Sequence, residues 1–131
     1  SDGDLGYVDP DGYLFLTGRS AEVIIAGGVN IYPQEVDNAL ASHPAVREVC
    51  AVGVPNEEWG EEVKAVVVLA DGYAATPELG RHLLTYARER LASFKQPRSV
   101  DFTDDIPHSE AGKVLRAAVR ARYWSGTERQ I

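Results

Sequence analysis

The sequence contains one cysteine, no methionine and no apolar run long enough to cross a membrane. A single thiol cannot form an internal disulfide, and the apolar neighbours of Cys50 predict a buried thiol in a reducing, cytoplasmic setting. Neither a signal-peptide pattern nor a membrane span is recognisable. The opening Ser1-Asp2-Gly3-Asp4, without an initiator methionine, suggests a piece of a longer protein.

Positive charge is also scarce. The chain has 13 Lys and Arg against 20 Asp and Glu, which gives a formal net charge of -7. Affinity for nucleic acid comes mainly from clustered Lys and Arg side chains that neutralise phosphates. We therefore expect no nucleic-acid partner.

Several common catalytic patterns are missing. The histidines His43, His82 and His108 are scattered, and one cysteine does not make a zinc site, so no metal site is expected. The sequence has no Gly-x-Ser-x-Gly nucleophile elbow and no Walker-type phosphate loop. These absences argue against a zinc enzyme, an α/β-hydrolase or a P-loop nucleotide site within this chain.

The elements that the sequence does indicate suit one domain. The chain has 131 residues, of which 44% are hydrophobic, enough for an ordinary core. Turn and helix signals predict hairpins over 5–16 and 23–31, helices from 33, 77 and 114, and strands over 46–54, 63–70 and 99–102. This order predicts an α+β fold: a small mixed sheet of about three strands packed with helices, plus short β-hairpins at the N-terminal side. On the last helix, Arg116, Arg120 and Arg122 are expected to be exposed.

A paired glycine turn lies at the centre of the stretch from Gly18 to Glu35. Arg19 is a fixed cation near its start, and Gly27-Gly28 separates two short apolar pieces. Two glycines let a ligand approach the backbone closely, because no side chain intervenes. The same pattern is also typical of an ordinary hairpin, so the residues alone leave both interpretations open.

A second candidate feature is the dipeptide Gly112-Lys113. It follows a polar loop and stands where the last helix is expected to begin. A lysine presents a mobile point charge, and helix N-termini favour anions, so the pair would suit a phosphate or a carboxylate. The alternative is a solvated surface lysine.

An ordered series of motifs resembles the adenylate-forming superfamily, which includes acyl-CoA synthetases, luciferases and the adenylation domains of peptide synthetases. The similarity runs over nearly the whole chain, and a single motif would carry little weight without the others. The motifs are, in order, Asp4-Leu5-Gly6-Tyr7, Asp11-Gly12-Tyr13, Gly18-Arg19, Gly27-Gly28-x-Asn30-Ile31-x-Pro33-x-Glu35-Val36, Val54-Pro55, Gly60-Glu61, Phe94-Lys95-x-Pro97, Ile106-Pro107 and Gly112-Lys113-Val114-Leu115-Arg116.

The resemblance implies a domain organisation and a reaction. Residues 1–19 would be the tail hairpin of a large N-terminal domain with the entry to a hinge, and residues 20–131 the mobile C-terminal domain. In such an AMP-forming acyl-CoA ligase, a carboxylate attacks the α-phosphate of ATP to give acyl-AMP and pyrophosphate. The small domain then rotates, and the thiol of CoA attacks the acyl carbonyl. The isolated chain would be inactive.

The resemblance also implies residue roles. Lys113 corresponds to the catalytic lysine of adenylation, whose charge can bridge the carboxylate and the phosphate oxygens. Gly112 leaves room for its loop to enter the site. Asp4 corresponds to the carboxylate that binds the ribose hydroxyls, although the threonine usual before that motif's glycine is replaced by Asp2. Arg19 corresponds to a ribose or phosphate contact.

The remaining implied roles concern rotation and thiol entry. Ser20 and Ala21 occupy the hinge, where the family usually has Asp or Lys at the position of Ala21. A small residue still permits a backbone rotation, but it removes charge-based control. Gly27 and Gly28 correspond to the turn that lines the passage for the pantetheine arm of CoA.

The substrates of the complete enzyme would be ATP with Mg²⁺, a carboxylic acid and CoA, and the partner would be the large N-terminal domain. One alternative is an adenylation enzyme that loads the phosphopantetheine of a carrier protein. Another is a stand-alone module that binds CoA or a protein partner. The identity of the acid lies outside this chain, because the acyl pocket belongs to the large domain.

Overall fold

The structure is a computed structural model that describes residues 22–129, with side chains through residue 124. The elements are β1 (Ile24–Ala26), β2 (Val29–Ile31), α2 (Pro33–Ala41), β3 (Val46–Asn56), β4 (Gly60–Leu69), α3 (Pro77–Arg88), a 3₁₀ turn η1 (Ser93–Lys95), β5 (Ser99–Phe102) and α4 (Arg116–Arg129). The predicted α+β class is confirmed. The expected hairpin over 5–16 and the proposed domain boundary at 19 lie outside the described residues.

One mixed sheet organises these elements. Its long hairpin pairs β3 with β4 in antiparallel register, from Val46 opposite Leu69 to Asn56 opposite Gly60. The other edge of β4 pairs with β5 in parallel and, at its first residue, with β1, which also pairs with β2. The expectation of about three strands was therefore too low. Over residues 22–129 the sheet has five strands, because the β1–β2 hairpin joins it through the pair Ala26–Gly60.

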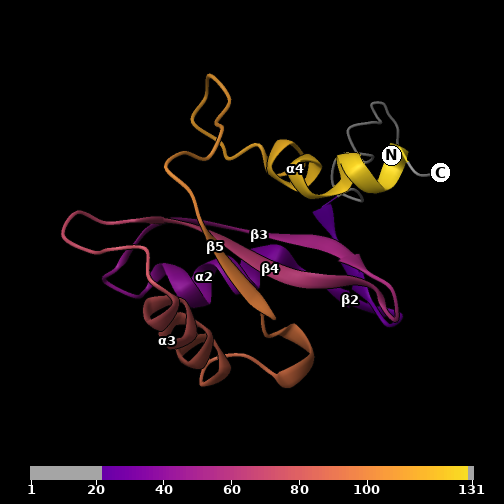
Figure 1. The fold of residues 1–131 in the computed structure, drawn as a ribbon, viewed down its shortest axis with the longest axis horizontal. Coiled ribbons are helices and arrows are strands. Elements are labelled where there is room, and N and C mark those ends of the chain that lie inside the picture. The colour runs from indigo at the N-terminus through magenta and orange to yellow at the C-terminus, as the bar shows by residue number, and fades with distance from the viewer. Residues whose placement is uncertain (1–21, 130–131) are drawn as a thin grey trace.

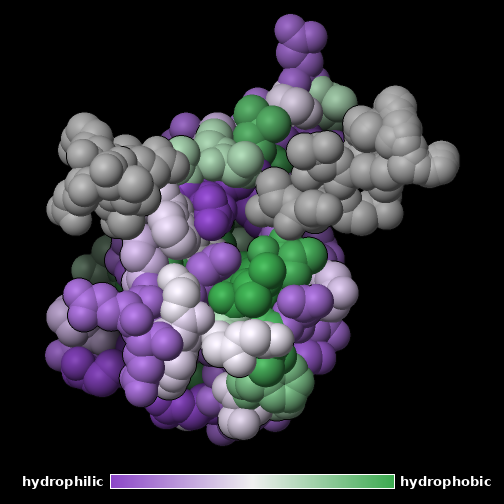
Figure 2. Space-filling view, turned by 90° about the vertical axis from the view of Figure 1, so that its right-hand side faces the viewer, coloured by the Kyte–Doolittle hydropathy of each residue, from purple (hydrophilic) through white to green (hydrophobic). Residues whose placement is uncertain are grey.

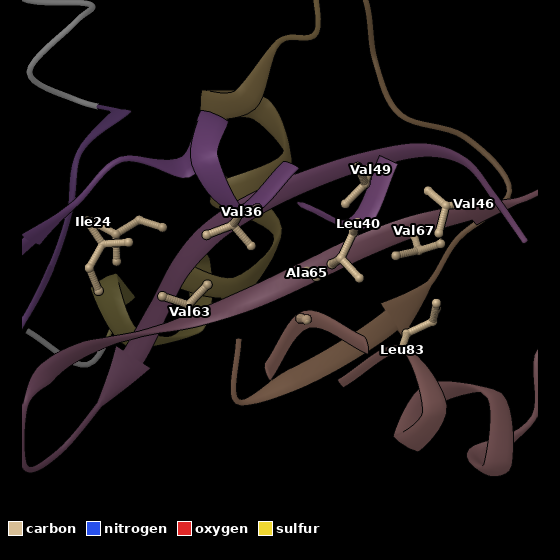
Figure 3. Packing of buried hydrophobic residues seen from close by; sticks show 12 residues of the cluster. Ile24, Val36, Leu40, Val46, Val49, Val63, Ala65, Val67 and Leu83 are labelled. Atoms are coloured by element: carbon tan, nitrogen blue, oxygen red, sulfur yellow. The ribbon is translucent and has the colours of Figure 1, made fainter. Parts of the chain in front are cut away.

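Helices cover both faces of this sheet: α2 and α3 lie on one side and α4 on the other (Figure 1). Side chains of a strand alternate between faces, so apolar residues at every position fill two cores. Odd-numbered positions such as Val63, Ala65 and Val67 of β4 face α2 and α3, where Leu40 and Leu83 meet them (Figure 3). Even-numbered positions face the second core, which comprises Cys50, Val52, Val54, Val66, Val68, Ile106 and Val119.

Two helix starts follow the predicted chemistry. Pro33 opens α2, where its fixed φ suits the first turn and its missing N–H costs no hydrogen bond. The Thr76 side chain caps α3 by accepting a hydrogen bond from the backbone N–H of Leu79 at 3.1 Å, with Pro77 at the first helical position. Leu83 and Ala87 of this helix are fully buried.

The last helix departs from the prediction. It begins at Arg116 rather than at Val114, and Val119 anchors it in the second core. The indole N–H of Trp124 donates to the backbone oxygen of Gly53 at 2.8 Å, which ties the helix to β3. Arg116 was expected to be exposed, but only 11% of its side chain is accessible. No helix in the described part of the chain is long and apolar enough to cross a membrane.

Candidate functional site

The structure describes four of the eight predicted site residues. Gly27 and Gly28 form the turn between β1 and β2, and Gly112 and Lys113 lie in the loop between β5 and α4. The other four, Asp4, Arg19, Ser20 and Ala21, fall outside the described residues. Their roles therefore stay predictions.

The glycine turn is a two-residue hairpin loop, because Ala26 pairs with Val29 across it. Both glycines have positive φ, 59° at Gly27 and 82° at Gly28. A Cβ at Gly27 would meet the Trp59 ring at an ordinary 3.9 Å, and a Cβ at Gly28 would meet nothing within 4 Å. Both positions therefore require glycine because of their backbone conformation and not because a side chain would clash with the described residues. The tip of the turn is open to an incoming molecule.

A pocket of about 290 Å³ adjoins this turn, and Gly27 is one of its lining residues. Two aromatic side chains, Trp59 and Phe94, line it together with Arg98. The Arg98 guanidinium lies over the Trp59 ring at 4.3 Å from its centroid, and Phe94 is 52% exposed. Flat apolar faces beside a fixed cation suit an aromatic ring that carries phosphate.

Trp59, Phe94 and Arg98 were not predicted to bind a ligand. For Phe94, the motif Phe94-Lys95-x-Pro97 was a signal in the sequence. The approach of Trp59 to Gly27 has no such signal, because it depends on how the β3–β4 turn meets β1. There the backbone N–H of Gly27 donates to the Trp59 oxygen at 2.9 Å. Figure 2 views the side on which β2 lies in Figure 1 and shows apolar surface gathered between polar regions.

The loop between β5 and α4 stands clear of the sheet on the α4 side (Figure 1). Lys113 lies in a tight turn of this loop. The backbone N–H of Ser109 donates to the Lys113 oxygen at 2.8 Å, and the Lys113 N–H donates back to the Ser109 hydroxyl at 3.2 Å. His108 and Val114 form an isolated antiparallel bridge below this turn. Gly112 allows its backbone to close with a φ of 89°. The exposed Lys113 side chain is thus presented by a short closed loop.

The expected position of Lys113 at a helix start is wrong, because α4 begins three residues later. Its charge therefore acts without a helix N-terminus directly beside it. An open hollow of about 500 Å³ near Lys113 is lined also by Asp37, Glu48 and Arg116. This hollow shares no lining residue with the pocket at Gly27. The structure thus places the two candidate features on separate surfaces.

A buried ion pair joins the end of the Lys113 loop to the rest of the domain. Arg116 Nη1 lies 3.0 Å from Asp37 Oδ2 and donates to the backbone oxygen of Ala51 at 3.0 Å. Asp37 Oδ1 accepts the backbone N–H of Ala51 at 2.7 Å. Burial raises the pKa of Asp37, although the Arg116 charge and the Ala51 N–H oppose this shift. Neither Asp37 nor this pairing was predicted from the sequence.

The pair also contacts the lone thiol. Arg116 Nη1 lies 3.6 Å from Cys50 Sγ, and Cys50 is fully buried as predicted. Burial raises the pKa of this thiol to about 11, so it is neither ionised nor accessible. Across the described residues, no group of three or more His, Cys, Asp or Glu side chains could hold a metal ion.

Comparison with known proteins gives a consistent result. Residues 35–113 match the family described as the AMP-binding enzyme C-terminal domain. A fatty acid–[acyl-carrier-protein] ligase of Streptomyces coeruleorubidus is 44% identical over 98% of this chain, and a feruloyl-CoA synthase of an Amycolatopsis species is 47% identical over 92%. The chain spans only 24% of the length of each of these relatives.

Solved structures agree with this match. The crystal structure of a Brucella canis acyl-CoA synthetase superposes with a TM-score of 0.74 at 38% sequence identity. That superposition covers 83% of this chain and 20% of the synthetase. The amide bond synthetase McbA of Marinactinospora thermotolerans covers 78% of this chain with a TM-score of 0.68 at 39% identity, and the chain spans 20% of it.

Proposed function

The chain belongs to the AMP-binding enzyme C-terminal domain family, and on that premise we propose that it is the mobile C-terminal domain of an ATP-dependent, AMP-forming acyl-CoA ligase. The large N-terminal domain would supply the nucleotide and acyl pockets. This chain would supply one surface for each half-reaction: the Lys113 turn for adenylation and the Gly27 pocket for thioester formation. The two separate surfaces are the observation that carries the proposal.

In the first half-reaction, a carboxylate oxygen of the acid bonds to the α-phosphorus of ATP while the bond to the pyrophosphate oxygen breaks. Negative charge gathers on the attacking carboxylate and on the phosphate oxygens. The ammonium group of Lys113, exposed at the end of a closed turn, can enter the large domain's site and offset that charge. Mg²⁺ would accompany ATP in the large domain.

The roles of four further residues rest on the sequence resemblance alone. Asp4 would accept hydrogen bonds from the ribose hydroxyls, and Arg19 would contact the ribose or a phosphate. Ser20 and Ala21 would form the hinge. Because Ala21 lacks a charge, we propose that rotation at this hinge depends on backbone freedom rather than on a local ion pair.

In the second half-reaction, the thiol sulfur bonds to the acyl carbonyl carbon, the thiol proton is lost and AMP leaves. The open tip at Gly28 allows a pantetheine arm to pass close to the backbone. The adjoining pocket offers Phe94 and Trp59 faces for an adenine ring and the Arg98 cation for phosphate. CoA carries all three of these chemical parts.

A second acceptor deserves a separate test because one relative is named a fatty acid–[acyl-carrier-protein] ligase. Its acceptor would be a phosphopantetheine thiol on a carrier protein, which lacks the adenine nucleotide of CoA. The aromatic and cationic pocket beside Gly27 favours CoA as the acceptor of this chain. We propose the cytoplasm as the location, in keeping with the single buried thiol.

The proposal is tested by combining this chain with the large domain, ATP, Mg²⁺ and a panel of carboxylic acids. We expect acyl-AMP formation that needs both parts, followed by transfer to CoA. The acceptor is identified by supplying CoA or a carrier protein separately. If the large domain forms acyl-AMP equally well without this chain, the proposed role in adenylation is wrong. Transfer to a carrier protein but not to CoA would establish the alternative acceptor.

A further inference from the structure

The Arg116–Asp37 pair ties the first residue of α4 to α2 in the interior of the domain, while the Nε atom of Arg116 is buried without a hydrogen-bond partner. Asp37 lies on the buried face of α2 with Pro33, Val36 and Leu40, and it is 8% exposed. Taking two charges out of water costs several kcal/mol for each ion, and a buried pair often stabilises a fold no more than apolar residues of equal volume. The pair therefore matters more for the geometry that it fixes than for stability.

That geometry is set by one nitrogen of the Arg116 guanidinium. Nη1 of Arg116 reaches both Asp37 Oδ2 and the backbone oxygen of Ala51, each at 3.0 Å. Asp37 is itself fixed by the Ala51 N–H at 2.7 Å. The guanidinium therefore lies in one plane and one direction, relative to both α2 and β3. A lysine at this position would retain the charge, but its ammonium group is a point charge on a flexible stem and is not held in a rigid planar group.

The Arg116–Asp37 pair lies at one end of the loop that carries Lys113. Two residues, Val114 and Leu115, separate Lys113 from Arg116, and Val114 packs against the second core. At the other end of the loop, Ile106 is 1% exposed in the same core. A weaker contact adds to this support, since His108 Nε2 lies 3.5 Å from Glu48 Oε1.

The turn itself has few means of fixing its direction. Besides the bonds between Ser109 and Lys113, it is closed by the Gly112 N–H to Ser109 oxygen bond at 2.9 Å. These bonds hold the shape of the turn but not its orientation on the domain. The backbone N–H of Leu115 donates to the Pro107 oxygen at 2.9 Å, which links the two ends of the loop. The orientation of the turn on the domain therefore depends on the residues that hold the two ends of the loop, and Arg116 is the buried charged residue at one end.

We propose that Arg116 and Asp37 are positioning residues that orient the Lys113 turn for adenylation. This inference rests on the proposed function of Lys113. Neither residue would touch the substrate. Their effect would pass through the backbone from Arg116 to Lys113, so its size would depend on Lys113 being present. A displacement of about 1 Å at a reacting group can cost about 10²-fold in rate.

The test is a double-mutant cycle in the protein that contains both domains, with acyl-AMP formation measured in single turnovers. Arg116→Lys should lower that rate about 10–100-fold when Lys113 is present. In a Lys113→Ala background, the same change should cost less than about twofold, because there is no ammonium group left to misplace. Asp37→Asn, which keeps an oxygen for the Ala51 N–H, should behave in the same way. Arg81→Ala, which removes an exposed arginine of α3 on the opposite side of the sheet from α4, is the control and should leave the rate unchanged.

Folding is followed in parallel by circular dichroism and thermal melting of each variant. If Arg116→Lys melts far below the parent, Asp37→Asn serves as the test variant. An equal loss from Arg116→Lys in both backgrounds would overturn the positioning role and show a general structural effect. An unchanged rate in Arg116→Lys would overturn it as well. If Lys113→Ala alone leaves acyl-AMP formation intact, the proposed function itself fails, which is a distinct result.

Discussion

Replacing Gly28 tests whether the β1–β2 turn needs glycine for its backbone or for the passage of a ligand. Gly28 has a φ of 82°, where a residue with a Cβ costs roughly 1–2 kcal/mol, and asparagine tolerates this region better than alanine. A Cβ there would meet nothing within 4 Å, so no clash adds to the cost. Gly28→Ala should therefore lower the free energy of unfolding by about 1 kcal/mol, and Gly28→Asn by less. Urea unfolding measures both.

Transfer to CoA should be slowed more by Gly28→Asn than by Gly28→Ala, the reverse of the order for stability. The reason is that the asparagine side chain projects further over the tip of the turn. In the protein with both domains, Gly28→Asn should slow transfer from supplied acyl-AMP to CoA at least about tenfold, through loss of close approach. Acyl-AMP formation should change less than about twofold. Normal transfer in Gly28→Asn would refute the proposed pantetheine passage. A stability loss for asparagine as large as for alanine would refute the backbone argument.

Two further predictions concern buried titratable groups. Burial lowers the pKa of His43 below its ordinary 6.5, with His82 and Arg90 acting in the same direction, so the unfolded chain binds a proton that the folded chain resists. The free energy of unfolding should therefore fall as pH drops from about 6.5. Between about pH 7.5 and about pH 5.5, the melting temperature of His43→Asn should depend less steeply on pH than that of the parent. Equal slopes for the two proteins would contradict this prediction. The Cys50 thiol, fully buried with a pKa of about 11, should react with a disulfide reagent only as fast as the chain unfolds, and rapid reaction of the native chain would show that it is accessible.

Local patterns in the sequence were sufficient for most of the elements. A continuous apolar run from Ala65 identifies β4 as a strand covered on both faces, and Thr76-Pro77 marks the start of α3 because both residues suit a helix N-terminus. The strand count could not be predicted in the same way. Whether a short hairpin joins a sheet depends on a single pair, Ala26–Gly60, between segments far apart in the chain.

The candidate site, like the fold, could be predicted from the sequence only in part. Lys113 and the two glycines could be identified as candidates from their motifs, but the role of Arg116 could not. An arginine on a helix is usually solvated, and its partner Asp37 lies on another helix much earlier in the chain. One signal was present: Pro33, Val36, Asp37 and Leu40 follow the spacing of a buried helix face, and a carboxylate in such a stripe requires a partner. Only the folded structure identifies that partner.

The most direct test of the whole account separates the two half-reactions in one variant, Lys113→Ala. In the protein that contains both domains, acyl-AMP formation should fall about 10²–10³-fold, because one electrostatic contact to the transition state is lost. Transfer from supplied acyl-AMP to CoA should stay within about twofold of the parent, because the Gly27 pocket shares no lining residue with the hollow near Lys113. Unchanged acyl-AMP formation, or an equal loss in both steps, would contradict the account.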